Sequence, residues 1–322
     1  MRIHYISYGI YETGGYRHEK TLFDSLSHYL GQTQEITARL FRKNKLFTHV
    51  FGYLELLFWS FLRSNADINI VTARTAIPAI LRNLYNKKEV WIVLHNFDPN
   101  DGKSALMKWY YQRLFFILNK SKHNRFKVIA VSHFWENYFR DITKVPHVYL
   151  FPNLFDTTFY LDFQQKKKNN WVHLGQFSSK NDLEILALSI KLSSDGYYCY
   201  FSTLNTEEAR PHNGSFDIIC FKDFTEYLDH MAQSCCTLAL TKINEGWNRM
   251  AHESILVGTP VIGYMRAGLG DLLKESNSMA VKNIDEAYTC IRESLWILPD
   301  KRFMEAYDIK NADKYLKPLC NS

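Results

Sequence analysis

The chain has 322 residues, of which 46% are hydrophobic and 15% aromatic, and its formal net charge is +6. That length and apolar content suit two packed domains of ordinary size. No apolar run reaches the length of a membrane span, the first residues lack the features of a signal peptide, and the six cysteines show no C-x-x-C pair. The sequence thus argues against an integral membrane protein and a disulfide scaffold, and we expect free thiols in a cytoplasmic protein.

The elements of the first half follow the alternation of short strands and helices that is typical of an α/β domain with a parallel sheet. A first strand is expected at residues 2–8, followed by a turn at Thr13-Gly14-Gly15 and a helix over residues 17–30. Further strands are expected at residues 68–72, 90–94, 127–131 and 147–151.

A polar, lysine-rich segment at residues 164–170 has no hydrophobic period and is interpreted as a linker. It separates a first domain, residues 1–165, from a second domain, residues 170–302. The second domain repeats the alternation, and its strands are expected at residues 171–174, 197–202, 216–220, 237–240 and 260–263. A last helix, within residues 303–322, is expected to pack back on the first domain.

The positive charge is concentrated in the first half of the chain. Residues 1–170 carry 24 Lys and Arg against 13 Asp and Glu, whereas residues 171–322 carry 15 against 20. This asymmetry indicates that the first half meets an anionic partner. Two stretches there, residues 39–62 and 103–127, mix cations with large apolar residues, which suits an anionic membrane surface. Helices with one buried and one solvated face explain either stretch equally well, and no nucleic-acid motif is present.

The most informative stretch runs from Asn244 to Gly263 and reads as a loop, a helix, a Gly-Thr-Pro turn and a buried strand. Glu245 lies in the loop, and Glu253 follows eight residues later inside the helix. Free N–H groups at a helix N-terminus suit a phosphate, and carboxylates, which only accept hydrogen bonds, suit sugar hydroxyls. One site could therefore hold both parts of a nucleotide sugar. Two solvated glutamates on a helix explain the spacing of the carboxylates alone equally well.

This stretch resembles the E-x7-E motif of retaining glycosyltransferases of the GT-B fold, family 4 in particular. Weaker signals of the same family precede it in the expected order. They are Thr13-Gly14-Gly15, His95-Asn96-Phe97-Asp98, Ala130-Val131-Ser132, Phe151-Pro152-Asn153-Leu154-Phe155-Asp156 and Leu174-Gly175-Gln176-Phe177-Ser178-Ser179-Lys180.

The resemblance implies an α/β protein with two Rossmann-like domains, whose parallel sheets face an interdomain cleft. The first domain would take the acceptor and the second the nucleotide sugar. By the same resemblance Glu245 contacts hydroxyls of the donor sugar and Glu253 those of the ribose. The phosphates would be held by backbone N–H groups in the stretch Gly246, Trp247, Asn248 and Arg249.

The sequence departs from the family in the charges around the phosphates. Lys180 is expected beside the diphosphate, where it would stabilise the leaving phosphate. The usual Arg four positions earlier is Gln176, which brings no charge, and Asn248 stands where Gly is common. Our hypothesis is that Arg249 restores the missing positive charge, although an ordinary surface residue of a helix explains Arg249 equally well.

Four further residues are candidates by resemblance. His95, at the end of a strand in the first domain, would lie near the donor sugar, although a strand-end histidine satisfied by the backbone is the structural alternative. Gly14 and Gly15 allow close approach of the backbone to a phosphate or acceptor, or serve only the turn. Phe221 follows a strand at the position where the family contacts the nucleotide base.

The expected reaction is transfer of a hexose from a UDP- or GDP-linked sugar to a glycan or lipid-linked acceptor, with retention at the anomeric carbon. No metal-ligand spacing is evident, and no cofactor besides the nucleotide sugar is implied. The implied setting is bacterial surface polysaccharide or glycolipid biosynthesis, in the cytoplasm or peripherally on the inner face of the cell membrane. Two alternatives stay open: a GT-B nucleotide-sugar epimerase, and a non-catalytic GT-B subunit of a transferase complex.

Overall fold

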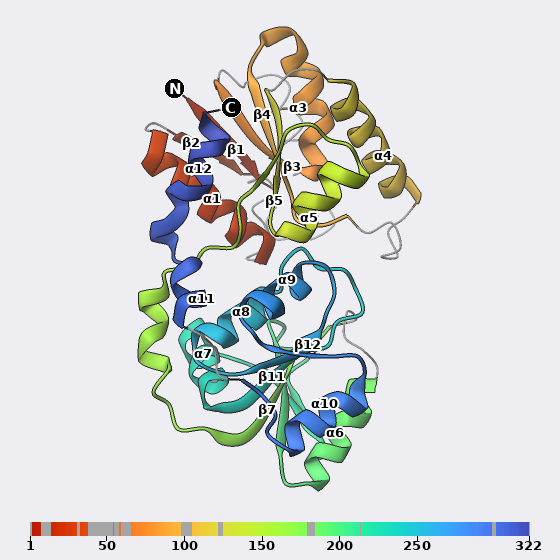
Figure 1. Ribbon diagram of the computed structural model, residues 1–322, viewed down its shortest axis with the longest axis vertical. Coiled ribbons are helices and arrows are strands. Elements are labelled where there is room, and N and C mark those ends of the chain that lie inside the picture. Colours follow the sequence, from red (N-terminus) through yellow and green to blue (C-terminus); the bar gives the residue numbers. More distant parts are fainter. Residues whose placement is uncertain are drawn as a thin grey trace. The chain divides into compact units, whose positions relative to one another are not determined.

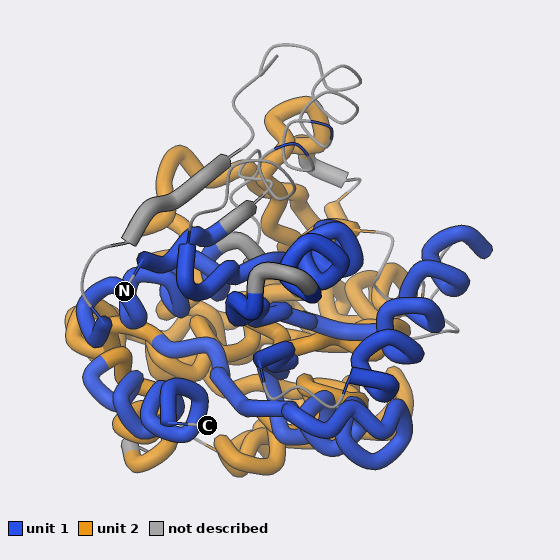
Figure 2. Tube along the Cα trace, turned by 90° about the horizontal axis from the view of Figure 1, so that it is seen from above, with its two compact units in different colours: residues 1–154, 310–322 blue, residues 155–309 orange. Residues whose placement is uncertain are grey.

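The computed structural model describes residues 2–7, 14–30, 33–37, 54, 58, 66–97, 105–121, 125–178, 184–212, 214–297 and 301–321. The chain splits into two compact units (Figure 2). The first unit combines Met1–Leu154 with Lys310–Ser322, and the second is the continuous segment Phe155–Ile309. The second unit is therefore an insertion between two pieces of the first.

The first unit is built on a parallel sheet, which has six strands among the described residues. Its central strands are nearly continuous buried apolar runs, as expected where helices cover both faces. The strand order is β2 (Thr33–Thr37), β1 (Ile3–Ser7), β3 (Ile68–Thr72), β4 (Glu89–Leu94), β5 (Phe126–Ala130) and β6 (Val148–Leu150). The helices are α1 (Gly14–Leu30), α3 (Ala73–Asn86), α4 (Ala105–Lys120), α5 (His133–Asn137) with the π-helix η2 (Tyr138–Ile142), and α12 (Ala312–Cys320).

The connections place the helices of the first unit on opposite faces of its sheet. The chain runs from β1 to β2 in one direction and from β3 through β4 and β5 in the other. Because such crossovers are right-handed, α1 must lie on the face opposite to α3 and α4. Figure 1 shows this arrangement, with α12 beside α1.

A buried lysine connects α12 to this sheet through a hydrogen bond. The side chain of Lys127 on β5 is 1% exposed, and its Nζ donates to the carbonyl of Leu319 in the last turn of α12 at 2.8 Å. Glu89 on β4 balances the charge at 3.2 Å and also accepts from Trp91 Nε1 at 2.6 Å. A cation at the C-terminal end of a helix is favourable, because it meets the exposed carbonyls of the helix dipole.

The second unit has a sheet of seven strands among the described residues, all parallel except β9. The strand order is β13 (Met279–Val281), β12 (Val261–Tyr264), β11 (Ser234–Ala239), β7 (Asn169–Gln176), β8 (Tyr198–Thr203), β10 (Phe216–Cys220) and β9 (Arg210–His212). Around it lie η3 (Thr157–Phe163), α6 (Glu184–Ser194), α7 (Phe224–Gln233), α8 (Arg249–Leu256), α9 (Ala267–Glu275), α10 (Ile284–Arg292) and α11 (Lys301–Ala306). The short helix η4 (Ile309–Asn311) spans the boundary in the chain between this unit and the last segment of the first unit.

The helices of the second unit also form two layers. The first layer pairs α6 with α10 over one face of the sheet (Figure 1). A core of apolar residues from both helices and the strands is buried there. The second layer pairs α7 with α8. The two ends of the unit are joined, because Phe155 N–H donates to the carbonyl of Tyr307 at 3.0 Å and Ile309 N–H donates to that of Phe155 at 2.8 Å.

The observed strands agree with the expected ones except at the edges and the linker. The strands β2, β9 and β13 were not expected, because they are short and lie toward the edges, where apolar alternation is weak. The expected linker at residues 164–170 already contains the first residues of β7, and the units divide earlier, after Leu154.

A buried histidine makes the stability of the second unit sensitive to acid. His173 on β7 stacks on Tyr200 with ring centroids 4.8 Å apart, and burial lowers its pKa from 6.5 to about 3. Between these values the unfolded chain binds the proton and the folded chain does not, so stability falls as the pH drops through this window. Within this window the free energy of unfolding falls by up to about 1.4 kcal/mol for each pH unit of acidification.

The test is urea unfolding of wild type and His173→Gln at pH 7.5, 6.0 and 5.0. We expect the fall in the unfolding midpoint with acid to be shallower in the variant. Equal pH slopes in the two proteins would contradict the assignment.

Candidate functional site

The sheet topology of the second unit selects one edge for a ligand. From β7 the chain proceeds to β8 and β10 on one side, and it then returns to form β11 and β12 on the other side. In open parallel sheets, ligands bind beyond the carboxyl ends of the strands where the strand order reverses. That switch point lies between β7 and β11. The loop that follows β11 is the one that contains Glu245.

Gly175 brings the end of β7 against the start of α8. Its φ of +98° is a left-handed conformation that glycine adopts most readily. A Cβ at this position would lie 3.1 Å from the carbonyl oxygen of Leu238 on β11 and 3.7 Å from the side chain of Met250 on α8. A larger residue would push these elements apart. Gln176, which ends β7 and is exposed, directly follows this glycine.

Asn248 organises the N-terminus of α8. Its Oδ1 accepts from the N–H of Ala251 at 2.8 Å, which is the bond of a helix N-cap, and its Nδ2 donates to Glu245 Oε2 at 2.7 Å. The backbone of Asn248 is extended, with φ −89° and ψ 96°, so glycine is not required there. The carbonyl of Glu245 also accepts from the N–H of Gly268 at 3.2 Å. One side chain therefore both starts the helix and orients the first carboxylate of the motif.

Arg249 and Glu253 form an ion pair one turn apart on α8. Arg249 Nε donates to Glu253 Oε1 at 2.9 Å, and the two side chains are 18% and 6% exposed. The guanidinium lies over the ring of Phe155, 4.3 Å from its centroid. Its Nη1 is buried without a hydrogen-bond partner among the described residues. The sequence left the role of Arg249 open. In the structure the charge of Arg249 is balanced by Glu253, the second carboxylate of the motif.

An aromatic cluster supports the motif from behind. Trp247 Nε1 donates to Nδ1 of the fully buried His252 at 3.0 Å, and the rings of Phe155, Phe303 and Tyr307 surround that histidine at centroid distances of 4.3, 5.0 and 5.1 Å. Burial, with Arg249 nearby, lowers the pKa of His252 well below its ordinary value, so the ring is neutral. The indole of Trp247 is thus buried in this cluster. The backbone of Trp247, and not its side chain, is therefore the part of the residue that suits a ligand.

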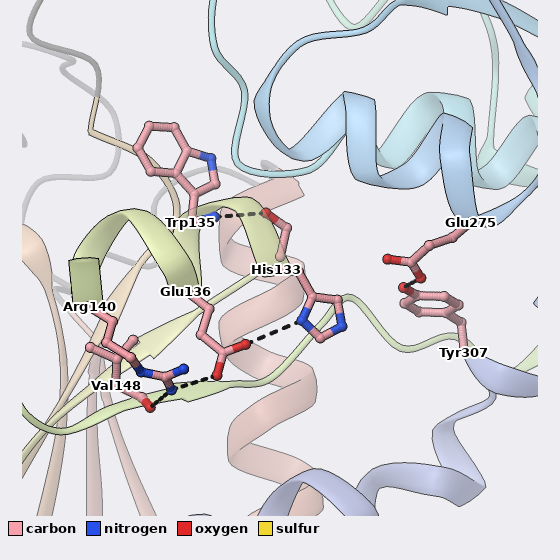
Figure 3. Close-up of polar contacts among 8 residues, drawn as sticks. His133, Trp135, Glu136, Arg140, Val148, Glu275 and Tyr307 are labelled. Carbon is pink, nitrogen blue, oxygen red and sulfur yellow. Dashed lines mark hydrogen bonds and ion pairs between the residues drawn. The ribbon is translucent and has the colours of Figure 1, made fainter. Parts of the chain in front are cut away.

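The same cluster reaches α9 through one further bond. The hydroxyl of Tyr307 donates to the carboxylate of Glu275 at the end of α9, as the close-up in Figure 3 shows. This contact joins the segment after α11 to the helix that follows β12. The helix of the motif is therefore supported by residues from the start, middle and end of the second unit.

Two other predicted donor residues have different surroundings. Phe221, just after β10, is half-buried and packs against Tyr227 and His230 of α7, with centroid distances of 5.6 and 5.3 Å. Lys180 lies outside the described residues, so its position beside the phosphates stays a prediction.

In the first unit the structure joins His95 to a carboxylate that the sequence analysis missed. His95 directly follows β4, and its Nε2 is 2.8 Å from Glu19 Oε1 on α1. The other oxygen of Glu19 accepts from the hydroxyl of Tyr5 on β1 at 2.6 Å. Glu19 is 7% exposed. The available signal was its position three and four residues before the buried Leu22 and Phe23, on the apolar face of the helix.

The neighbouring histidine of the same helix completes this cluster. His18 is 1% exposed, its Nε2 is 2.8 Å from the carbonyl of Phe151, and its ring meets that of His95 edge-on at 5.2 Å. Gly14 and Gly15 are the first residues of the same helix, α1. Among the predicted first-domain residues, His95 and the two glycines are thus related through α1.

Ser132, two residues after β5, caps the next helix. Ser132 Oγ accepts from the N–H of Trp135 at 3.4 Å. Glu136 accepts from Arg140 at 2.9 Å and lies 3.2 Å from His133 Nδ1. Arg140 also donates to the carbonyl of Val148 at 3.1 Å, which ties η2 to β6. These contacts give the Ala-Val-Ser signal a local structural explanation.

Neither a metal centre nor a membrane span is found in the part of the chain that the structure describes. No group of three or more His, Cys, Asp or Glu side chains is placed to hold a metal ion there. No described helix combines the length and the apolar content needed to cross a membrane.

Comparison with known proteins identifies the fold. No family model matches the sequence, and no curated protein matches it significantly. Among solved structures, HepE of Anabaena in complex with UDP-glucose is similar with a TM-score of 0.70 and 11% identity, covering 100% of both chains. Sucrose-phosphate synthase of Thermosynechococcus elongatus has a TM-score of 0.69 and 12% identity over 99% of this chain and 94% of that one.

A third similar structure is a glycosyltransferase of Rickettsia africae, with a TM-score of 0.64 and 13% identity over 100% of this chain and 99% of that chain. Together these likenesses show that the chain has the GT-B fold. The GT-B resemblance seen in the sequence is therefore confirmed at the level of the fold.

Proposed function

We propose that the protein is a glycosyltransferase that moves a sugar from a nucleotide sugar to a glycan or lipid-linked acceptor, with retention at the anomeric carbon. The observation that carries the proposal is the placement of Glu245, Asn248 and the first turn of α8 at the switch point of the second sheet. The similarity to HepE, which was solved with UDP-glucose, supports a UDP-linked donor over a GDP-linked one.

In this proposal the second unit binds the donor. Backbone N–H groups at the start of α8 face the diphosphate, where the positive end of the helix dipole is favourable. Glu245, oriented by Asn248, accepts from hydroxyls of the sugar, and Glu253 accepts from those of the ribose. Gln176 contributes a hydrogen bond beside the phosphates, and Lys180 the compensating charge.

The protein then acts mainly by positioning and electrostatics. The leaving phosphate accepts the proton of the acceptor hydroxyl as that oxygen attacks the same face of the anomeric carbon. The bond to the phosphate breaks as the new glycosidic bond forms, and charge grows on the leaving diphosphate. The dipole of α8 and the cation of Lys180 stabilise that charge.

The test combines thermal shift with a search for new products. Wild type is mixed with UDP, GDP, ADP and CMP and with their common sugars, and a ligand that binds only the native state raises the melting temperature. We expect a shift with UDP and UDP-sugars that Glu245→Gln weakens for the sugars but keeps for UDP. Glu293→Gln, an exposed glutamate near the end of α10, is the matched control and should match wild type.

Incubation of the donor with and without candidate acceptors then tests the reaction. Transfer to an acceptor with an α-linked product from an α-linked donor supports the proposal. Conversion of the donor to a different nucleotide sugar in the absence of acceptor would identify an epimerase instead. Absence of any shift and any product would favour a non-catalytic subunit.

We further propose that the first unit attaches to an anionic membrane through the outer face of α4. Leu106, Trp109 and Phe116 are 71%, 52% and 55% exposed on this helix, and they share a helical stripe with Arg113 and Lys120. The guanidinium of Arg113 lies 5.6 Å from the Trp109 ring centroid, and Lys120 Nζ lies 5.9 Å from that of Phe116. Rings that settle at the interface beside cations that meet headgroups suit such a surface.

We expect wild type to co-sediment with vesicles containing anionic lipid at low salt, and less at high salt, because exposed charges are screened. Each cation contributes about 1 kcal/mol, so Arg113→Gln with Lys120→Gln should weaken binding roughly 30-fold. Trp109→Ser with Phe116→Ser should also weaken it. Ile190→Ser on α6, 58% exposed in the second unit, is the control. Undiminished binding of the α4 variants would remove this surface from the proposal.

A further inference from the structure

Glu19 is a buried carboxylate whose two oxygens have separate donors. It lies on α1, and its side chain is 9% exposed, whereas that of His95 is 29% exposed. Tyr5, fully buried on β1, donates to one oxygen at 2.6 Å, and His95 Nε2 lies 2.8 Å from the other. A carboxylate is costly to bury unless it is hydrogen-bonded, and these two bonds compensate that cost. The arrangement connects the first strand, the first helix and the residue after β4.

The contact determines which nitrogen of His95 carries the proton. A carboxylate only accepts hydrogen bonds, so Nε2 must be the donor, and in the neutral ring Nδ1 is then an acceptor. Nδ1 of His95 has no hydrogen-bond partner among the described residues. His18 lies edge-on to the ring, with centroids 5.2 Å apart, and is itself bonded to the carbonyl of Phe151. Glu19 and His18 therefore hold the imidazole of His95 on two sides, and Nδ1 is the nitrogen that can accept a further hydrogen bond.

We propose that Glu19 is a positioning residue for His95, which it holds in the tautomer whose Nδ1 accepts a hydrogen bond from a hydroxyl of the sugar substrate. The inference rests on the proposed function, because a glycosyltransferase must bind a sugar whose hydroxyls His95 can meet. It adds the residue that orients this histidine, and it gives the histidine the role of acceptor. Without the carboxylate, the ring can rotate or take the opposite tautomer, in which Nδ1 donates and no longer accepts.

The direct test is the tautomer itself. Proton–nitrogen correlation spectra of the 15N-histidine-labelled full chain distinguish an Nε2–H ring from an Nδ1–H ring, and the His95→Gln spectrum assigns the signal. We expect the Nε2–H form in wild type and a mixture or the opposite tautomer in Glu19→Gln. Asp24→Asn, at the exposed pair with Lys20 on the same helix, is the matched control and should leave the His95 signal unchanged. An unaltered His95 signal in Glu19→Gln overturns the proposal.

The second test is a double-mutant cycle on transfer. Loss of one oriented hydrogen bond should lower kcat about 10- to 100-fold in Glu19→Gln. UDP should still raise the melting temperature as it does in wild type. In the His95→Ala background, Glu19→Gln should have no further effect, because its target is absent. An equal loss in both backgrounds overturns the proposal. The tautomer measurement needs no substrate, so absence of transfer in wild type would count against the proposed function and not against the positioning role.

Discussion

Replacing Glu253 by alanine should lower the free energy of unfolding of the second unit by about 3–5 kcal/mol, in addition to removing a donor contact. The carboxylate is the ion-pair partner of Arg249, whose guanidinium lies over Phe155 with a buried Nη1. Loss of one partner leaves a charge in a poorly solvated place. Urea unfolding with hydrogen-exchange mass spectrometry of peptides from α7 and α8 measures the effect in this unit.

A second variant separates the two roles of Glu253. Arg249→Met with Glu253→Gln removes both charges, so it should recover most of the stability while donor binding stays weak. The exposed pair Lys20–Asp24 has the same spacing on α1 and is the control, since breaking it should cost less than 1 kcal/mol. If the double variant binds the nucleotide sugar as wild type does, neither charge serves the donor. If Glu253→Ala unfolds like wild type, the pair is not a stabilising contact.

Replacing Lys127 by alanine should destabilise the first unit by about 2–5 kcal/mol. The change deletes a buried side chain whose Nζ lies 5.3 Å from the Trp91 ring centroid, and it removes the hydrogen bond from Lys127 to the carbonyl of Leu319. Because a protein of two units need not unfold in one step, the effect should be measured for each unit separately. We expect faster amide exchange in β5 and α12 and unchanged exchange in β7 and β11.

Lys88→Ala provides the control for this experiment. Lys88 also belongs to the first unit, and its Nζ lies 2.5 Å from Asp67, but the side chains are 37% and 45% exposed. Such a pair contributes little, so exchange should change only slightly. Equal effects of the two lysine variants would mean that the contact with α12 is not what stabilises this edge of the sheet.

The fold could be predicted from the sequence wherever strands are apolar runs. β4 and β5 are buried along nearly their whole length, and such runs are visible in the sequence. β2, with the sequence Thr-Gln-Glu-Ile-Thr, and the three-residue strand β13 depend on their neighbours for pairing, so they carried no signal. The GT-B resemblance came from ordered motifs and is confirmed by structural likeness, whereas membership of family 4 stays a prediction.

The candidate site could be predicted only where chemistry follows from local spacing. Glu245, Asn248 and the start of α8 are close in sequence, so the loop and helix could be deduced from residue types. The partner of His95 could not, because Glu19 lies 76 positions away along the chain. Arg249 was ambiguous for a different reason. A cation one turn before a glutamate can face a phosphate or that glutamate, and only packing on Phe155 distinguishes the two.

The insertion of the second unit has a consequence for biosynthesis. On the ribosome, the strands β1 to β6 are all synthesised before Phe155, whereas α12, which accepts the hydrogen bond from Lys127, is synthesised only after Ile309. The first unit therefore lacks α12 while the second unit is translated. During that time Lys127 and the apolar face of the sheet that α12 covers are exposed to solvent. The second unit is continuous and its ends are hydrogen-bonded together, so it can fold as soon as it emerges. The unit that starts first is thus the one completed last, which exposes it to chaperones for longest.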